Sequence, residues 1–225
     1  TWDPDDPKGK EKYLDDPEGW AFSQRIVEEA MKESGLPYVE GKGEAAFYGP
    51  KVDFQFRTVT GREETASTNQ LDFGIAARMD LNYTDANDTP QRPYIIHRAP
   101  LGTHERFVAF LIEHYGGAFP TWLSPIQVRV VTVADRFNDY GQKIVDELRG
   151  HMVRAEIDTS NETMGKKVRT AITTKIPNIL ILGEREMDEE TVTLRRYGQR
   201  EQETMPVAEF KDRLLKAIAG RTKSI

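Results

Sequence analysis

The chain has 225 residues, enough for one large domain or two modest ones. With 38% hydrophobic and 30% charged residues, its composition is ordinary for a globular protein. A formal net charge of -6 is not typical of a nucleic-acid binder, although a basic patch on one domain would suffice for RNA binding. The lack of cysteine excludes disulfide bonds and thiolate metal sites within this sequence.

The sequence contains no apolar run long enough to span a membrane and no recognisable signal peptide. We therefore expect no membrane partner and a cytoplasmic location. Because the first residue is Thr1 rather than methionine, we also expect the chain to be processed or cut from something longer.

The first 19 residues are acidic and carry prolines in turn-forming pairs, which predicts a loop. Residues 20–34 have helical spacing of apolar side chains, and Gly35 is a natural C-terminal cap, so a packing helix is predicted there. The apolar face of this helix is expected to consist of Trp20, Ile26, Val27, Ala30 and Met31.

Residues 43–73 are predicted to form antiparallel sheet. Val52, Phe54 and Phe56 alternate with polar residues, as in a strand with one solvated face. A turn at Thr60–Gly61 leads into a second strand, whose small hydroxyl residues could line a polar cleft or could simply populate an edge strand. The polar residues 80–92 are predicted to be a surface loop.

Residues 93–125 hold the most informative pattern. An apolar strand at 94–96 is expected to break at His97, and a helix is expected to begin near Thr103. Arg106 lies in the first turns of that helix, where a cation opposes the helix dipole, so it could serve an anionic ligand. The alternative, which spacing alone favours, is a solvated arginine on an ordinary amphipathic helix. The expected buried face consists of Phe107, Phe110, Leu111 and His114.

The prolines at 120 and 125 mark a change of rhythm, which predicts one domain at 1–124 and another at 125–225. After this junction, strands alternate with helices, which indicates an α/β domain with a mixed, mainly parallel sheet covered on both faces. Strands are expected at 128–133, 152–157, 179–182 and 191–196, and helices at 138–149, 162–175 (capped by Asn161) and 206–218. Gly198 is expected to turn the chain after the last strand.

Cations recur in the second domain. Positive charge beside an aromatic or guanidinium plane is what unpaired RNA bases require. The alternative is the ordinary decoration of a helix surface by lysine and arginine. The residues concerned are Lys166, Lys167, Arg169, Lys175, Arg195, Arg196 and Tyr197.

Several stretches together resemble a known family. The sequence reads His97-Arg98-Ala99, Leu101-Gly102, Glu105-Arg106-Phe107 and Trp122-Leu123-Ser124-Pro125, which is similar to motif 3 of the class II aminoacyl-tRNA synthetases. The stretches Phe47-Tyr48-Gly49-Pro50-Lys51 and Gln70-Leu71-Asp72-Phe73 match the threonyl-tRNA synthetases in the same order. The resemblance covers nearly all of the chain from Gly43 onward. It implies the end of an antiparallel-sheet catalytic domain followed by an α/β anticodon-binding domain.

The resemblance also implies roles for single residues. Arg106 matches a catalytic position that contacts ATP phosphates, and His97 matches a zinc ligand. Tyr48, Thr68 and Gln70 match positions at the threonine and ATP pocket, and Lys51 matches one near ATP and the tRNA acceptor end. The anticodon-contacting positions of the family fall on Asn161, Arg169, Glu186 and Arg195.

One segment departs from the family. The usual tryptophan-glutamine-cysteine-glycine appears here as Glu64-Thr65-Ala66-Ser67, and Asn69 replaces an aliphatic residue. Any role carried by the glutamine that Thr65 replaces is therefore in doubt, whereas His97 and Arg106 are not affected.

The resemblance implies threonine, ATP with Mg²⁺, Zn²⁺ and tRNA(Thr) as ligands, and a homodimer for the full-length enzyme. The family binds its zinc through two further residues that precede this sequence, and an open zinc position reads the threonine hydroxyl, which valine lacks. The family's motifs 1 and 2 are not found here. We therefore expect the chain by itself to be catalytically incomplete.

Three functions follow as hypotheses. The first is a threonyl-tRNA synthetase that activates threonine with ATP and transfers it to tRNA(Thr). The second is a non-catalytic RNA-binding paralogue, for which His97, Arg106, Tyr48 and Gln70 would have no use. The third is a related enzyme for another amino acid, against which the pattern of residues 47–51 argues.

Overall fold

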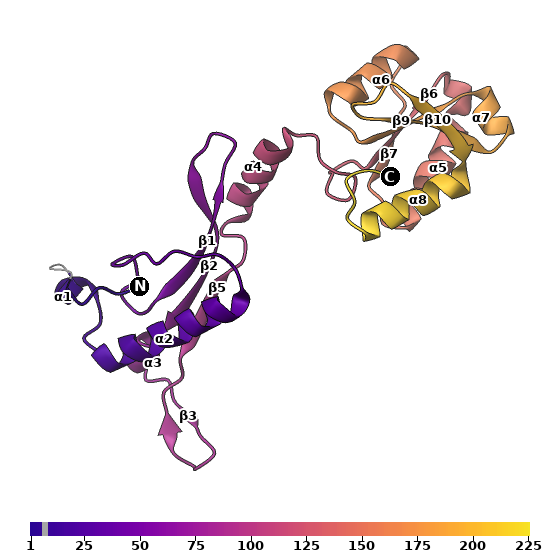
Figure 1. The fold of residues 1–225 in the computed structure, drawn as a ribbon. Helices are drawn as coiled ribbons and strands as arrows, with labels where there is room; N and C mark the ends of the chain where they lie inside the picture. The colour runs from indigo at the N-terminus through magenta and orange to yellow at the C-terminus, as the bar shows by residue number, and fades with distance from the viewer. Residues whose placement is uncertain (6–8) are drawn as a thin grey trace. The chain divides into compact units, whose positions relative to one another are not determined.

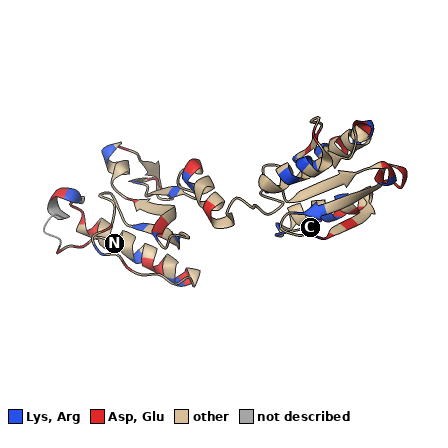
Figure 2. Ribbon diagram, turned by 90° about the horizontal axis from the view of Figure 1, so that it is seen from above, with Lys and Arg blue, Asp and Glu red and all other residues tan. Residues whose placement is uncertain are grey.

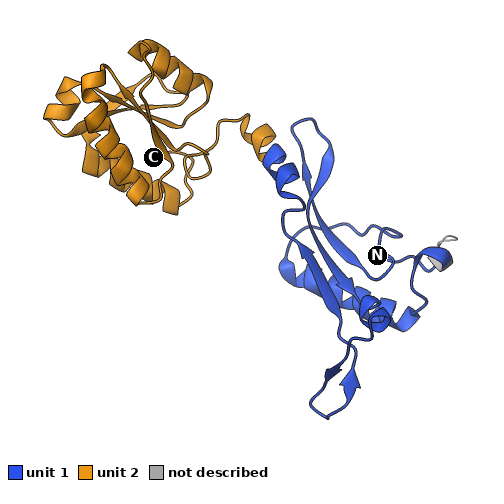
Figure 3. Ribbon diagram, turned by 180° about the vertical axis from the view of Figure 1, so that it is seen from behind, with its two compact units in different colours: residues 1–110 blue, residues 111–225 orange. Residues whose placement is uncertain are grey.

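A computed structural model of the protein describes residues 1–5 and 9–225. They divide into two compact units, residues 1–110 (unit 1) and 111–225 (unit 2), as Figure 3 shows. The division falls inside helix α4 (His104–Tyr115), so the residues between Pro120 and Pro125 lie within unit 2. That a domain able to fold alone begins near Pro125 stays a prediction.

Unit 1 is built on the predicted antiparallel sheet, with strand order β1-β2-β5. The strands are β1 (Lys51–Arg57), β2 (Glu63–Asp72) and β5 (Ile95–Ala99), and Figure 1 shows them together. The expected break at His97 is wrong. β5 continues to Ala99 because its residues pair in register with residues 68–72 of β2, which gives the backbone a continuous ladder.

The described part of the lead-in to unit 1 is more ordered than predicted, and residues 6–8 of the predicted loop lie outside the described residues. It includes a short helix, α1 (Gly9–Lys12), and α2 (Pro17–Ser34) begins three residues before the predicted start. Proline is favourable in the first turn of α2, and the Asp16 carboxylate caps the helix by accepting from the Gly19 N–H. Gly35 ends the helix with a φ of 66°, as predicted.

The polar excursion at 80–92 is also more regular than a loop. It forms an exposed two-stranded ribbon of β3 (Tyr83–Thr84) and β4 (Pro90–Gln91), preceded by the short helix α3 (Ile75–Arg78). The Asp85 carboxylate accepts from the N–H groups of Asn87 and Thr89 and so closes the turn between the strands.

The apolar faces of unit 1 are only partly covered. Trp20 is fully buried against Trp2, Tyr13 and Phe73, but Ile26 on the same helix is 37% exposed. The buried face predicted for α4 is wrong, since the helix has no buried residue in the described part of the chain. Its main aromatic contact is Phe110 with Phe56, whose ring centroids are 4.4 Å apart.

Unit 2 has a five-stranded sheet of order β10-β9-β8-β6-β7. Helices α5 and α8 pack on one face of the sheet around Leu180 and Phe210, and α6 packs on the other face around Val131 and Ile179. The strands are β6 (Val128–Thr132), β7 (Ala155–Asp158), β8 (Asn178–Leu182), β9 (Thr191–Arg196) and β10 (Gln202–Pro206). The helices are η1 (Asp135–Phe137), α5 (Asn138–Gly150), α6 (Met164–Thr173), α7 (Glu184–Asp188) and α8 (Val207–Ala219).

The sheet of unit 2 is mixed, as predicted, although parallel and antiparallel pairings are equal in number, so that the parallel part is smaller than expected. β6 is parallel to β7 and β8, whereas β9 is antiparallel to both β8 and β10. β9 and β10 form a hairpin that turns at Gly198, whose φ is 77°. The strand β10 was not predicted from the sequence. The prediction that Asn161 caps this helix is wrong, because α6 begins at Met164 and Thr163 occupies the cap position.

Both units carry Lys and Arg interspersed with Asp and Glu, as the colours in Figure 2 show. Among the residues that the structure describes, no helix is both long enough and apolar enough to cross a lipid bilayer.

Candidate functional site

A polar pocket of about 290 Å³ lies in unit 1, between the β1–β2 pair and the start of α4. The antiparallel register builds it, since Lys51 pairs with Gln70 and Asp53 pairs with Thr68 on the same face of the sheet. Arg106 completes the lining from α4. The structure therefore brings together four of the residues predicted from the sequence, namely Lys51, Thr68, Gln70 and Arg106.

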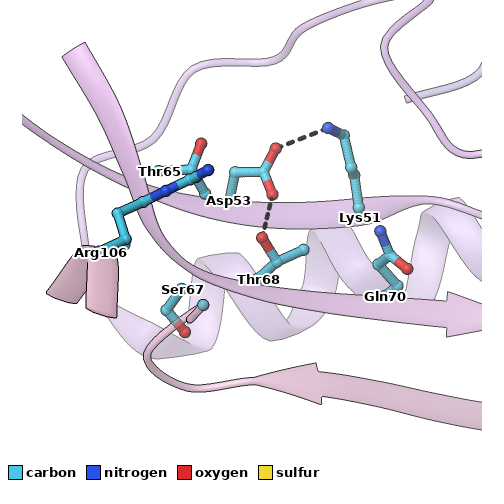
Figure 4. A pocket seen from close by; sticks show the side chains of 9 residues that line it. Lys51, Asp53, Thr65, Ser67, Thr68, Gln70 and Arg106 are labelled. Atoms are coloured by element: carbon cyan, nitrogen blue, oxygen red, sulfur yellow. Dashed lines mark hydrogen bonds and ion pairs between the residues drawn. The ribbon is translucent and has the colours of Figure 1, made fainter. Parts of the chain in front are cut away.

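Asp53 organises the charges of this pocket. Its carboxylate accepts from the Thr68 hydroxyl at 2.7 Å and from the Lys51 ammonium at 2.8 Å. In Figure 4, Asp53 and Thr68 lie between Lys51 and Arg106. Arg106 is exposed and forms no ion pair with any residue that the structure describes, so its charge is free to meet an anionic ligand. Sequence reasoning missed Asp53, although its place in the alternating pattern of β1 could have suggested it.

Tyr48, which lies before β1, contacts one of the residues that line this pocket. Its hydroxyl is hydrogen-bonded to the side-chain oxygen of Gln70. The backbone beside it follows the end of β2, with the Leu71 N–H donating to the Pro50 carbonyl and the Phe73 N–H donating to the Tyr48 carbonyl. This approach requires glycine at position 49, where an added Cβ would lie 1.7 Å from the Leu71 carbonyl oxygen.

His97 is oriented by a buried acid. Its Nε2 lies 2.7 Å from Asp72 Oδ2, and Asp72 has no exposed surface. The other Asp72 oxygen accepts from the N–H groups of Gly74 and Ile75, both at 2.9 Å, so the carboxylate is fixed from two sides. A neutral imidazole that donates from Nε2 leaves the lone pair of Nδ1 available. Sequence reasoning missed Asp72, although it lies within the quoted 70–73 stretch.

The zinc role of His97 can be tested against this geometry. A carboxylate behind the ring is the usual support of a metal-binding histidine, so the residue suits one ligand position. A catalytic zinc site has three protein ligands, and the described part of the chain contains no group of three possible ligand side chains. His97 could therefore hold the metal only together with ligands from elsewhere.

The four residues predicted to contact an anticodon lie on β9, α6, α7 and the connection before α6, and the register relates β9 to the face of the sheet that α6 covers. Arg195 is the cross-strand partner of Ile179, which packs against α6, so Arg195 points to the α6 side. Arg169 is exposed on that helix, and Asn161 is exposed in the connection that precedes it. Glu186 accepts a hydrogen bond from the Thr193 hydroxyl. Thr193 is the cross-strand partner of Ile181, which packs on the same side of the sheet as Ile179.

The side chains of this face differ in freedom. Both oxygens of Glu186 are occupied, one by the Gly183 N–H at 2.9 Å and one by Thr193 at 2.8 Å, so in this structure Glu186 braces the turn into α7. Arg195 has a buried Nε without a partner in the described residues and has spare donors. Lys167, one of the cations singled out in the sequence, is only 3% exposed and is therefore not available to an RNA phosphate. Lys166 is exposed and pairs with Glu162.

Two protein families match the chain, one in each part. Residues 15–115 match the tRNA synthetase class II core domain (G, H, P, S and T), and residues 127–217 match an anticodon binding domain. The pocket and His97 lie in the first match, and the polar face beside α6 lies in the second.

The chain is 49% identical over 214 residues to the threonine–tRNA ligase of Anoxybacillus flavithermus, covering 95% of this chain and 33% of that protein. The ligase of Streptococcus pneumoniae strain ATCC 700669 is 47% identical over 219 residues, which are 97% of this chain and 34% of that one. The chain thus spans about a third of the length of these relatives.

The crystal structure of the RNA binding domain of threonyl-tRNA synthetase from Cryptosporidium parvum Iowa II has a similar fold. It matches with a TM-score of 0.83 and 31% identity over 95% of this chain and 53% of that one. The chain belongs to the class II aminoacyl-tRNA synthetases and aligns with the C-terminal part of threonyl-tRNA synthetases, from the core domain through the anticodon binding domain.

Proposed function

We propose that the protein to which this chain belongs is a threonine–tRNA ligase, which activates threonine with ATP and transfers it to tRNA(Thr). The observation that carries the proposal is the pocket in the core-domain match, where two cations face hydroxyl and amide groups. We propose that the protein acts in the cytoplasm as a homodimer, as the family does.

In unit 1, Arg106 is the cation that meets the ATP phosphates. Activation is an attack of the threonine carboxylate on ATP, which gains most from positioning and from donors aimed at the developing charge. The exposed Arg106 guanidinium offers such donors at the mouth of the pocket. Mg²⁺ bound with ATP would supply further charge stabilisation. Lys51, held by Asp53, faces the same space and would serve ATP and the acceptor end of the tRNA.

Threonine is held by the residues around His97. Tyr48, Thr68 and Gln70 present hydroxyl and amide groups on the side of the sheet where His97 pairs in register with Gln70. A zinc ion bound there would supply a Lewis acid able to coordinate the threonine hydroxyl. His97 would be one of its ligands, oriented by Asp72, and the other ligands would come from parts of the full-length protein that this chain does not include.

The test is ATP–pyrophosphate exchange with a panel of amino acids, using the full-length protein. We expect exchange with threonine and rejection of valine, because a site that binds a hydroxyl directly leaves its polar groups unpaired when valine enters. Exchange with another amino acid would support the related-enzyme hypothesis. A protein that binds tRNA but supports no exchange would support the RNA-binding paralogue.

The chain as printed gives a second test. With His97 as a single candidate ligand among the described residues, the 225-residue chain should bind zinc weakly and should make no threonyl-adenylate. Stoichiometric zinc and robust exchange by this chain alone would contradict the assignment of the missing ligands to another segment.

In unit 2, the face that carries Asn161, Arg169 and Arg195 binds the anticodon loop of tRNA(Thr). Arg195 has unused donors on a partly buried side chain, which suits stacking on a base or hydrogen bonding to it. Lys166, exposed and paired only at the surface, suits a phosphate. Glu186 reads the loop only if a base displaces one of its present partners.

Titration of labelled anticodon stem-loops separates the two kinds of contact. Arg195→Ala should reduce discrimination between the cognate and an altered anticodon, whereas Lys166→Ala should weaken both equally and lower the salt dependence by about one phosphate contact. Equal loss for both loops in Arg195→Ala would remove the base-reading role. If the wild type shows no preference, the anticodon assignment fails.

A further inference from the structure

Lys167 is a buried cation near the start of α6, at a place where a charge is unfavourable. Its exposed fraction is 3%, and its buried neighbours on the helix are Val168 and Ala171. Lysine is almost never fully buried without a partner, and a cation in the first turns opposes the helix dipole. An apolar side chain would fill this position at a lower cost in desolvation. Packing alone therefore does not explain an ammonium group at this position.

The contact of Lys167 joins the two ends of one connection. Its Nζ donates to the main-chain oxygen of Asp158 at 3.1 Å. Asp158 is the last residue of β7, and α6 begins at Met164, so the bond ties the end of the strand to the helix across residues 159–163.

A turn within the connection reinforces this tie. The Asp158 Oδ1 accepts from the Ser160 N–H at 3.0 Å and from the Ser160 hydroxyl at 2.6 Å, which closes a local turn. Burial raises the pKa of Asp158, but the bonds from Ser160 and the nearby charges of Lys167 and Arg129 outweigh it and leave the pKa below its usual value. The carboxylate that closes the turn is thus kept ionised.

The residue that this connection presents is Asn161. It lies between Ser160 and the helix, and it is exposed. We propose that Lys167 is a positioning residue, which fixes the 159–163 connection so that the Asn161 amide meets an RNA base in one defined orientation. The inference rests on the proposed function of unit 2. It assigns no contact of Lys167 with RNA, because the ammonium is buried.

The test compares Lys167→Met with Lys166→Met in the full chain. Methionine keeps the length and apolar stem of lysine but cannot donate to Asp158. Lys166 is the matched control, since it is the adjacent residue on the same helix and is exposed. Two stem-loops are titrated, one with a threonine anticodon and one with a single altered base, while amide hydrogen exchange follows residues 159–163.

For Lys167→Met we expect faster exchange in residues 159–163 and about a tenfold loss in the ratio of the two affinities, with little change in melting temperature. For Lys166→Met we expect both affinities to fall together and the ratio to stay. An unchanged ratio together with unchanged exchange in Lys167→Met would overturn the proposal. So would a drop in melting temperature with the ratio intact, since that result would make Lys167 structural only.

A second variant keeps the test decisive if Lys167→Met does not fold. Ser160→Ala, at an exposed position, loosens the same turn without creating a cavity, and it should lower the ratio in the same direction by a smaller factor. A full wild-type ratio in Ser160→Ala would also count against the proposal. If the wild type itself shows no preference, the proposed anticodon function fails, and hydrogen exchange alone then decides whether Lys167 orders the connection.

Discussion

Unit 2 and unit 1 stabilise their sheets in different ways. In unit 2, helices cover both faces of the sheet, and most of the buried apolar side chains of the described chain lie there. In unit 1, the buried apolar residues are Tyr13, Trp20, Ala45 and Ala76, and large side chains such as Ile96, 72% exposed, remain open to solvent. The unit with the better core presents the polar face proposed for RNA, and the unit with the pocket has little core of its own.

This difference predicts unequal resistance to proteases. A fragment containing unit 2 should survive limited proteolysis, while unit 1 is degraded, because cleavage requires local opening and unit 1 has fewer buried contacts. The fragment should start a few residues before the predicted boundary at Pro125 and retain Thr121, since Asn178 bonds Thr121, and Arg154 bonds the carbonyls of Trp122 and Ser124. Mass spectrometry of the fragment gives its first residue. A protease-resistant fragment that lacks unit 2 would show that unit 1 is the more stable of the two units.

Truncations of buried side chains should show the difference between the two cores directly. Phe210→Ala in unit 2 removes a fully buried ring and should destabilise that unit by about 3–5 kcal/mol. Phe54→Ala in unit 1 removes a ring that is already 39% exposed and should cost about 1 kcal/mol or less. Denaturant unfolding followed separately for each unit measures both, and equal losses would contradict the account of the two cores.

Arg106 tests the chemical role of unit 1. In the full-length protein, Arg106→Ala should slow threonyl-adenylate formation by about 10², because a donor to the developing charge is lost. Arg92→Ala, at an exposed position directly after β4, is the matched control and should leave the rate unchanged. A normal rate in Arg106→Ala would mean that this residue is only a solvated cation.

Asp72 tests the support of His97. Asp72→Asn replaces an acceptor of the His97 ring with a group that can also donate, so the preference for one ring tautomer should weaken. The ring-nitrogen chemical shifts of His97 report this directly, and zinc affinity of the full-length protein should fall by about 10–100-fold. Unchanged shifts would show that the ring is oriented by other contacts.

A small pH effect is expected in unit 2. Hydrogen bonds from Arg196 and Arg213, each at 2.7 Å, lower the pKa of Glu203 from its usual 4.5. A pKa that is lower in the folded state stabilises the protein above the unfolded value and ceases to do so as the pH falls through the folded value. Unit 2 should therefore lose some stability below about pH 4.5, and Glu203→Gln should reduce that slope in pH-dependent unfolding. The effect should be modest because the pair is partly exposed.

Much of the fold could be predicted from local patterns. The alternation of residues 51–57 and the helical spacing after Trp20 give the sheet and helix of unit 1, and Gly35 and Gly198 turn the chain where expected. The hairpin partner β10 was missed because its residues 202–206 are polar and edge-like, without an apolar signal. The burial of α4 was overestimated, since periodicity shows which face is apolar but not whether another element covers it.

The candidate site was predictable where the resemblance named a residue. Lys51, Thr68, Gln70 and Arg106 meet in one pocket, as a shared role would require. Asp72 and Lys167 could not be judged from the sequence, because their importance lies in burial and in a single partner far along the chain or in the backbone. From the sequence alone, a charged residue is expected to be exposed to solvent, and only the structure shows that it is buried.

Gly49 sets a limit on how the proposed threonine pocket could be redesigned. With the Leu71 carbonyl 1.7 Å from any added Cβ, every other amino acid at this position must push the 48–50 segment away from β2. Tyr48 would then move away from Gln70, although neither residue had been altered. A library that varies positions 47–51 should therefore hold Gly49 constant, and a loss of activity in a Gly49 variant found by chance should be attributed to a displaced tyrosine rather than to a missing contact.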